Sequence, residues 1–243
     1  MEFIFFILTY FLLTSVVIGF GYFFAKNIST YNSNSNIGYI GLYGIFSLTL
    51  ISYVTNLFIK HDYLHNFIIL FIGIFLFIQY IFSNKKLKRN KDIKYFLFFL
   101  IISTLSIFYF KSHDDFPYYH LSFIHNLTLN KLEFGLGNFD LAFNHVSSLF
   151  FFHSLFKLPF TEDYFYFLGP VLIMVFSNII LAKSILEDKK KLNFIFFLKL
   201  FTFIFINTFF YRLAEHGTDR SAIILIFVSI IIIFEILKNR KLS

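Results

Sequence analysis

Two adjacent carboxylates, Asp114 and Asp115, follow an apolar run and precede Pro117 and the sequence YYH at 118–120. A carboxylate in such a place can act as a general base, and the adjacent pair can supply oxygen ligands to a hard divalent cation. Proline and carboxylates are also favoured in the first turn of a helix, so the pair fits an acidic cap of a helix over residues 117–130 equally well. The sequence leaves both interpretations open.

That helix is expected to be amphipathic. Its apolar residues Tyr118, Phe123 and Leu127 alternate with polar ones, which gives an apolar side and a polar side. A short helix of this kind lies on a membrane surface with its polar side in the water and among the lipid headgroups. The polar residues are His120, Ser122 and His125.

A second polar segment, YRLAEHGTDRS at 211–221, contains two of the four arginines of the chain. The planar guanidinium groups of Arg212 and Arg220 suit phosphate or carboxylate, which they can bind with two parallel hydrogen bonds. Glu215 and Asp219 offer an internal alternative, in which they pair with these arginines and order a tight loop. The two arrangements are compatible, because one arginine can brace the loop while the other faces a ligand.

Local structure signals lie between these two segments. The sequence GLGN at 135–138 predicts a turn, and its glycine spacing does not match a phosphate-binding loop. Asn144, Ser147 and Ser148 are candidates for the N-cap of a short helix over residues 146–158. His145, beside them, is either part of that helix start or a contact to a ligand.

The composition places these groups in a membrane protein. The chain of 243 residues is 58% hydrophobic and 14% charged, whereas soluble domains carry about 25% charged residues. It contains no Cys, which excludes disulfides, thiol nucleophiles and thiolate metal sites. The net charge of +7 comes from short lysine clusters between apolar runs, which indicates membrane orientation rather than a nucleic-acid partner.

Seven apolar runs are candidates for membrane-spanning helices, which need about 17–25 mostly apolar residues. The first follows Glu2 without a basic segment before it, so we interpret it as an uncleaved helix rather than a signal peptide. The fourth is short, but Lys94 and Lys111 flank it and can reach the interface. The sequence predicts an all-α transmembrane bundle of about seven spans, whose long outer loop carries two short amphipathic surface helices. The runs cover residues 3–25, 37–59, 66–83, 95–110, 164–182, 192–210 and 221–237.

The basic residues predict which side each loop faces. Lysine and arginine favour the cytoplasmic side, and they concentrate at 84–94, at 183–191 and in the C-terminal tail. If both internal clusters are cytoplasmic, an even number of spans separates them, so the stretch 146–158 does not cross. We expect it to be an amphipathic or re-entrant helix at the outer surface. The alternative is that it crosses and one cluster lies outside. The first topology places loops 111–163 and 211–221 outside, together with all eight histidines.

Two fragments carry a resemblance to a known superfamily. DFPYYHL at 115–121 is similar to a D-x-x-x-Y-H stretch in bacterial membrane proteins assigned to the GT-C superfamily of integral-membrane glycosyltransferases. RLAEHGTDR at 212–220 looks like a segment from the same group. The resemblance covers residues 95–237, which divides the chain into three N-terminal helices, 1–94, and a GT-C-like module, 95–243. Because superfamily members are usually considerably longer, we expect this chain to be the N-terminal part of a longer protein.

The resemblance implies hexosyl transfer from a polyprenyl-phosphate donor to an acceptor on the outer face of the bacterial inner membrane, with inversion at the anomeric carbon. Asp115, or alternatively Asp114, would deprotonate the acceptor hydroxyl. Arg212 and Arg220, with His216, would stabilise the departing phosphate. The further contacts to substrate that it implies come from Tyr118, Tyr119, His120, Glu215 and Asp219.

The same resemblance sets the expected cofactor and partners. Some superfamily members use a divalent cation and others do not. His113, Asp114, Asp115 and His120 offer ligands for Mg²⁺ or Mn²⁺, although their spacing does not require a metal. The expected partners are a lipid-linked sugar donor, a glycan or lipid acceptor and the membrane lipids, without nucleic acid.

Two other functions remain open on the sequence. A transporter or flippase for a lipid-linked or anionic solute would place charges at mid-membrane and use broken helices in repeated halves. Gly169-Pro170 is the single candidate break, and it has no counterpart elsewhere in the sequence. A polysaccharide polymerase or ligase also joins lipid-linked sugars at the outer face. Uptake into vesicles would indicate the first, and the length of the product would indicate the second.

Overall fold

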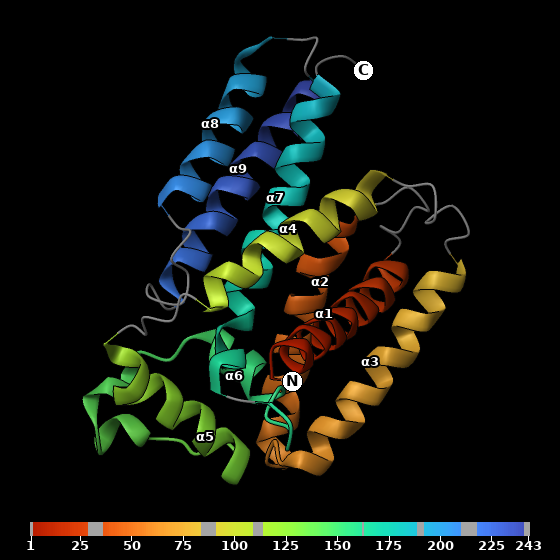
Figure 1. Ribbon diagram of the computed structural model, residues 1–243. Helices are drawn as coiled ribbons and strands as arrows, with labels where there is room; N and C mark the ends of the chain where they lie inside the picture. Colours follow the sequence, from red (N-terminus) through yellow and green to blue (C-terminus); the bar gives the residue numbers. More distant parts are fainter. Residues whose placement is uncertain are drawn as a thin grey trace.

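The computed structural model describes residues 2–28, 36–83, 91–108, 114–161, 163–188, 192–209 and 218–240, and every regular element within these ranges is a helix. Seven long helices coincide with the seven apolar runs. They are α1 (Glu2–Asn27), α2 (Ile37–Phe58), α3 (Tyr63–Ser83), α4 (Lys91–Phe108), α7 (Leu168–Asp188), α8 (Phe194–Phe209) and α9 (Asp219–Arg240). In Figure 1 the helices α7, α8 and α9 run side by side, and α4 lies across α7.

Five of the long helices are long and apolar enough to cross a membrane. The apolar part of α4, Ile93–Thr104, and the helix α8 are shorter. The predicted set of seven spans therefore comprises five helices that meet this criterion and two that do not. The five candidate spans are Phe3–Asn27, Ile37–Phe58, Tyr63–Ser83, Phe165–Asp188 and Asp219–Leu237.

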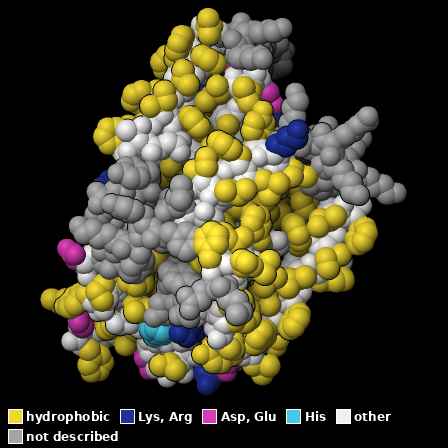
Figure 2. Space-filling view, in the orientation of Figure 1, with side chains coloured by type: hydrophobic (Ala, Val, Ile, Leu, Met, Phe, Trp, Pro, Cys, Tyr) yellow, Lys and Arg dark blue, Asp and Glu magenta, His cyan; other side chains and the backbone are white. Residues whose placement is uncertain are grey.

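The helix α7 forms the centre of the bundle. It contacts α2, α4, α8 and α9. In the most apolar stretch of each helix, 94% of α7 is buried, against 33% of α3 and 22% of α9. The exposed faces of the outer helices are apolar, as at Phe71 and Phe75 on α3. Figure 2 shows apolar side chains over most of the described helical surface, with several charged side chains and a histidine along its lower edge. Such a surface is suited to lipid.

One end of the bundle, which we call the loop end, collects three connections. The turn between α2 and α3 lies against residues 114–161, because the His61 amide donates to the Leu127 carbonyl at 3.0 Å. The side-chain amide of Asn66, near the start of α3, donates to the carbonyl of Ser154 at 2.8 Å. The start of α9 shares a pocket with Asp115. The turn between α2 and α3, residues 114–161 and the start of α9 therefore lie together at this end.

Helix α1 packs closely against α2 and α3 through glycines. A Cβ atom at Gly44 of α2 would overlap the carbonyl oxygen of Val17, and one at Gly21 of α1 would overlap that of Ile40. A Cβ at Gly73 of α3 would meet the side chain of Val16. Small residues let helix backbones approach closely, which is a common way of packing helices within lipid.

We expect Gly44→Leu to lower the free energy of unfolding by about 1–3 kcal/mol, because the new side chain has to push α1 away from α2. Denaturant titration in detergent micelles measures the change. Phe46→Leu on the same helix is the matched control, since Phe46 is exposed. Equal stability of the two variants would contradict the close approach.

The predicted helix over residues 117–130 is present as a short π-helical turn, η2 (Phe116–His120), followed by α5 (Leu121–Leu129). Its buried side carries Phe116, His120, Phe123 and Leu127, three or four residues apart as on one face of a helix. The predicted sides are wrong at two positions, because Tyr118 is exposed and His120 is buried. The prediction sorted these side chains by polarity, whereas their position on the helix decides which side they occupy.

The predicted amphipathic or re-entrant helix over residues 146–158 is shorter and differently placed. The helix α6 (Ser148–Ser154) has seven residues, which extend over about 10 Å and cannot cross a membrane. All its side chains from Leu149 to Ser154 are buried, among α2, α5 and α7. The prediction of a helix that lies on the surface is therefore wrong, because the apolar side chains of Leu149–Phe152 fill the space between these helices. The polar side chains of His153 and Ser154 form hydrogen bonds inside the protein.

Three short turns complete this region. Gly135 adopts φ +84° and precedes η3 (Leu136–Asn138), so the turn predicted at GLGN is present. The next turns are η4 (Leu141–Asn144) and, before α7, η5 (Asp163–Phe167). Ser147 caps α6, because its hydroxyl accepts a hydrogen bond from the Leu149 amide at 3.3 Å.

Candidate functional site

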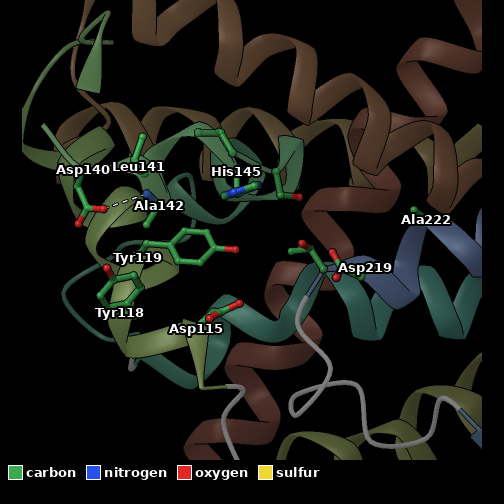
Figure 3. Close-up of a pocket in the computed structure, with 12 residues that line it drawn as sticks. Asp115, Tyr118, Tyr119, Asp140, Leu141, Ala142, His145, Asp219 and Ala222 are labelled. Atoms are coloured by element: carbon green, nitrogen blue, oxygen red, sulfur yellow. Dashed lines mark hydrogen bonds between the residues drawn. The ribbon is translucent and has the colours of Figure 1, made fainter. Parts of the chain in front are cut away.

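An open pocket of about 750 Å³ lies at the loop end, where three segments far apart in the sequence meet (Figure 3). The first segment carries Asp115 and two tyrosines at the start of η2, the second is the stretch around η4, and the third is the start of α9. The lining residues are Asp115, Tyr118, Tyr119, Asp140, Leu141, Ala142, His145, Val146, Ser147, Thr218, Asp219 and Ala222.

Asp115 and Asp219 enter the pocket from the ends of two helices. Asp115 stands at the N-cap position of η2, but its side chain makes no capping hydrogen bond there. The sequence had left open whether this carboxylate is a helix cap, and that arrangement is not formed at Asp115. Asp219 is the first residue of α9, where the helix dipole favours a negative charge. In Figure 3 the two carboxylates reach the same space from different sides.

Tyr119 lines the pocket together with the two carboxylates. Burial, together with the negative charges of Asp115 and Asp219, raises the pKa of the Tyr119 phenol. The phenol is therefore protonated at neutral pH, and its O–H can donate a hydrogen bond into the pocket. Its ring stands at right angles to the imidazole of His120, with 4.4 Å between the ring centroids. Figure 3 shows the hydroxyl directed into the pocket.

His120 does not line the pocket, although the sequence predicted it as a substrate contact. Its side chain is buried and packs against the ring of Phe150, with 4.7 Å between the centroids. It therefore lies beneath Tyr119 and helps to fix the position of that ring. Tyr118, in contrast, lines the edge of the pocket and is exposed.

The second wall of the pocket was not predicted. Asp140 caps η4, because its Oδ1 accepts a hydrogen bond from the Ala142 amide at 2.9 Å. This bond holds the turn in place and brings Asp140, Leu141 and Ala142 to the pocket. The sequence contains the local signal, an aspartate two residues before a backbone amide that it caps. It contains no signal that this turn faces Asp115. His145, which the sequence left as either a helix-start residue or a ligand contact, lines this wall.

The remaining predicted residues are not in the lining. Asp114 is exposed and Arg220 is partly buried, and neither lines the pocket. The described part of the chain contains no group of three or more His, Asp or Glu side chains that could hold a metal ion. The predicted contacts His113, Arg212, Glu215 and His216 lie outside the described residues.

A comparison with known protein families gave a match over the whole chain. The profile of a family described as "Domain of unknown function (DUF8201)" matches residues 1–243. The chain belongs to this family. No curated protein and no solved structure gave a significant match. Because the DUF8201 description names no activity, the pocket is the guide to function.

In this DUF8201 chain the buried side chain of His61 connects α2 with α6. The hydroxyl of Thr55 lies 2.9 Å from Nε2 of His61, and Nδ1 of His61 lies 2.6 Å from the hydroxyl of Ser154. The Ser154 hydroxyl donates to the Phe151 carbonyl, so it accepts from Nδ1 of His61. His61 is fully buried, and burial favours the neutral imidazole, whose Nε2 can accept from Thr55.

A second buried histidine caps α7. The amide of Gly169 donates to Nε2 of His153 at 3.1 Å, which requires a neutral ring. Burial, and then the nearby His65, lower the pKa of His61 to about 3. Burial, and then the nearby His120, lower the pKa of His153 to about 3. Both histidines therefore hold helix ends together in their uncharged form.

We expect the DUF8201 chain to lose stability as the pH falls from 7 to 5. The pKa of each histidine is lower in the folded state than in the unfolded chain, where it is about 6.5. The contribution of each neutral histidine to the free energy of unfolding is therefore present above pH 6.5, and it is lost as the pH falls towards 3. The loss between pH 7 and 5 is about 2 kcal/mol for each histidine. Unfolding midpoints measured across this range test the prediction.

His153→Gln is the informative variant, because glutamine can still accept from the Gly169 amide but takes up no proton. The variant should lose less stability between pH 7 and 5 than the original chain, by about the amount that one histidine contributes. His145→Gln is the control, since His145 is exposed. If the stability of His153→Gln changes with pH as steeply as that of the original chain, His153 does not cap α7 as a neutral ring.

Proposed function

We propose that the chain is a membrane glycosyltransferase of GT-C type, which moves a hexose from a polyprenyl-phosphate donor to a hydroxyl acceptor on the outer face of the membrane. The observation that carries this proposal is the pocket at the loop end. It brings Asp115 and Tyr119 of one predicted outer loop together with Asp219 of the other. A volume of about 750 Å³ falls within the usual range of small-molecule sites.

The membrane arrangement belongs to the same proposal. At 1.5 Å per residue, α4 with 18 residues and α8 with 16 extend over about 27 and 24 Å. These lengths approach the hydrocarbon thickness of about 30 Å, and flanking lysines can reach the interface. We propose that both helices cross, which gives seven spans. The basic clusters then lie in the cytoplasm and the pocket opens on the outer side of a bacterial inner membrane.

Asp115 is the proposed general base. Its carboxylate takes the proton of the acceptor hydroxyl while that oxygen attacks the anomeric carbon from the face opposite the phosphate. The bond from the anomeric carbon to the phosphate oxygen breaks, and its electron pair leaves with the polyprenyl phosphate. The configuration at the sugar is thereby inverted. Asp115 is partly buried and lines the pocket, which suits this role.

Other side chains of the pocket position the sugar. The Asp219 carboxylate can accept hydrogen bonds from sugar hydroxyls, and the Tyr119 phenol can donate one. Stabilisation of the departing phosphate is assigned to Arg212, Arg220 and His216, as the resemblance implies. Of these, Arg220 follows Asp219 directly at the start of α9.

Reconstitution into liposomes with a polyprenyl-phosphate hexose and a mixture of outer-face acceptors tests the proposal. We expect release of polyprenyl phosphate together with transfer of the sugar. Accumulation of solute inside the liposomes without transfer would instead indicate a transporter. Growth of the product into long chains would indicate a polymerase.

A further inference from the structure

The most exposed large apolar side chains of the described residues are not on the long helices. They are Phe139, Phe134 and Leu141, with exposed fractions of 91%, 83% and 78%. All three belong to residues 132–146, which we call the apolar loop. On the long helices the highest value is 75%, at Phe82. Lipid accounts for exposed apolar side chains on a membrane-crossing helix, but the apolar loop contains no such helix, so its exposure needs a separate explanation.

The apolar loop lies beside α2 rather than beyond its end. The amide of Leu132 donates to the carbonyl of Asn56 at 2.9 Å. Tyr53 lines a cavity of about 360 Å³ together with Phe134 and Phe143 of the loop. Asn56 and Tyr53 are in the last two turns of α2, which ends at Phe58, so the contacts extend about 7.5 Å back from the helix end. The headgroup layer on each side of a bilayer has about this thickness.

Two carboxylates and several backbone amides of the apolar loop are paired within the protein. Glu133 accepts a hydrogen bond from the Asn126 side-chain amide at 3.0 Å, and Asp140 accepts one from the Ala142 amide. The backbone forms successive turns, in which the amides of Asn138, Phe139 and Phe143 donate to carbonyls within the loop. A backbone whose amides are paired internally loses less on leaving water. The exposed side chains of Phe134, Phe139 and Leu141 are therefore the large apolar groups of the loop that lack cover within the described residues.

We propose that the apolar loop is seated in the outer lipid interface, with Phe134, Phe139 and Leu141 inserted below the headgroups. Lipid is the occupant that the position beside the last turns of α2 favours. Lys131 is the only basic residue at or next to the loop, and Glu133 and Asp140 are acidic, so the insertion depends on apolar contact and not on anionic lipid. Since Leu141 also lines the 750 Å³ pocket, insertion holds the mouth of that pocket at the membrane surface. The inference rests on the proposed crossing of α2 but not on the transfer reaction.

The chain contains no Trp, so a single introduced tryptophan reports its own surroundings. We choose Phe139→Trp in the full chain, reconstituted at low density into phosphatidylcholine vesicles that contain lipids brominated either near the headgroup or near the chain end. Bromine quenches tryptophan fluorescence on contact. Phe75→Trp is the matched control, because Phe75 is an exposed phenylalanine in the middle of α3.

We expect Phe139→Trp to emit at shorter wavelength than free tryptophan amide and to be quenched more strongly by the shallow bromine than by the deep bromine. Phe75→Trp should show the reverse order. Quenching of Phe139→Trp by aqueous iodide, with no response to either lipid, would overturn the proposal. So would shielding that disappears when the protein is diluted in lipid, since a second copy would then be the occupant. Phe134→Trp repeats the test in case the substitution at 139 disturbs the fold. Loss of transfer activity alone leaves these spectra unchanged, so the two proposals fail separately.

Discussion

Replacing Asp115 by asparagine is expected to lower the rate of sugar transfer by about 10²- to 10⁴-fold, the usual contribution of a general base. Asparagine keeps the size of the side chain but cannot take up the proton of the acceptor hydroxyl. The fold should survive, because the substitution keeps the shape of the side chain at a position that is only partly buried. The measurement is the initial rate of polyprenyl-phosphate release in proteoliposomes, with donor and acceptor both saturating.

Asp114→Asn is the matched control for this experiment. It makes the same change of charge one residue earlier, at an exposed position that does not line the pocket. We expect it to retain most of the activity. Activity lost in Asp114→Asn and kept in Asp115→Asn would move the base to Asp114, and full activity in both would remove the aspartate mechanism altogether.

The meeting of Asp115 and Asp219 in one pocket follows largely from features that the sequence contains. Each stands next to an end of a long apolar run, and counting the runs places both ends on the same side. Helices that alternate between two ends then bring such residues to one end of the bundle. The sequence does not contain the lateral arrangement of the helices, so it could not say that these two ends are neighbours rather than opposite corners.

Burial within the loop end was harder to predict. The stretch 146–158 has too few residues to span a membrane, and a surface position was the simplest alternative. In the structure α6 instead fills the space among α2, α5 and α7, which only the assembled bundle creates. His120 is buried for the same reason, since it faces Phe150 of α6. The sequence around a histidine at the end of a helix does not tell whether its side chain lines a pocket or packs in the interior.

A buried charge at the opposite end of the bundle was also overlooked. Lys199 lies within the apolar run 192–210, where a charged residue requires a partner. Its Nζ lies 2.6 Å from Oδ2 of Asp188 and also forms an ion pair with Glu235. Ser184 donates a further hydrogen bond to Glu235 at 2.7 Å. The sequence showed the lysine, but its partners come from α7 and α9, which only the fold brings to α8.

Removing this lysine is expected to have the largest effect on stability. Lys199 has an exposed fraction of 1%, and Lys199→Met leaves two carboxylates close together without their shared cation. Breaking a buried ion pair costs about 3–5 kcal/mol. We expect the lower part of this range, because the side chains of Asp188 and Glu235 are 18% and 31% exposed and water can solvate them in part. A loss of about 3 kcal/mol lowers the unfolding midpoint by about 6–12 °C in a chain of this size.

Two comparisons make the cause of that loss measurable. Lys60→Met removes the lysine of an exposed pair with Asp62, in which the charged atoms are 3.8 Å apart, and it should change stability by less than about 1 kcal/mol. Adding Asp188→Asn and Glu235→Gln to Lys199→Met removes the repulsion between the carboxylates and should restore part of the loss. If Lys199→Met unfolds at the same temperature as Lys60→Met, the ion pairs do not hold α7, α8 and α9 together. If the triple variant is no more stable than Lys199→Met, the loss comes from packing of the lysine stem and not from charge.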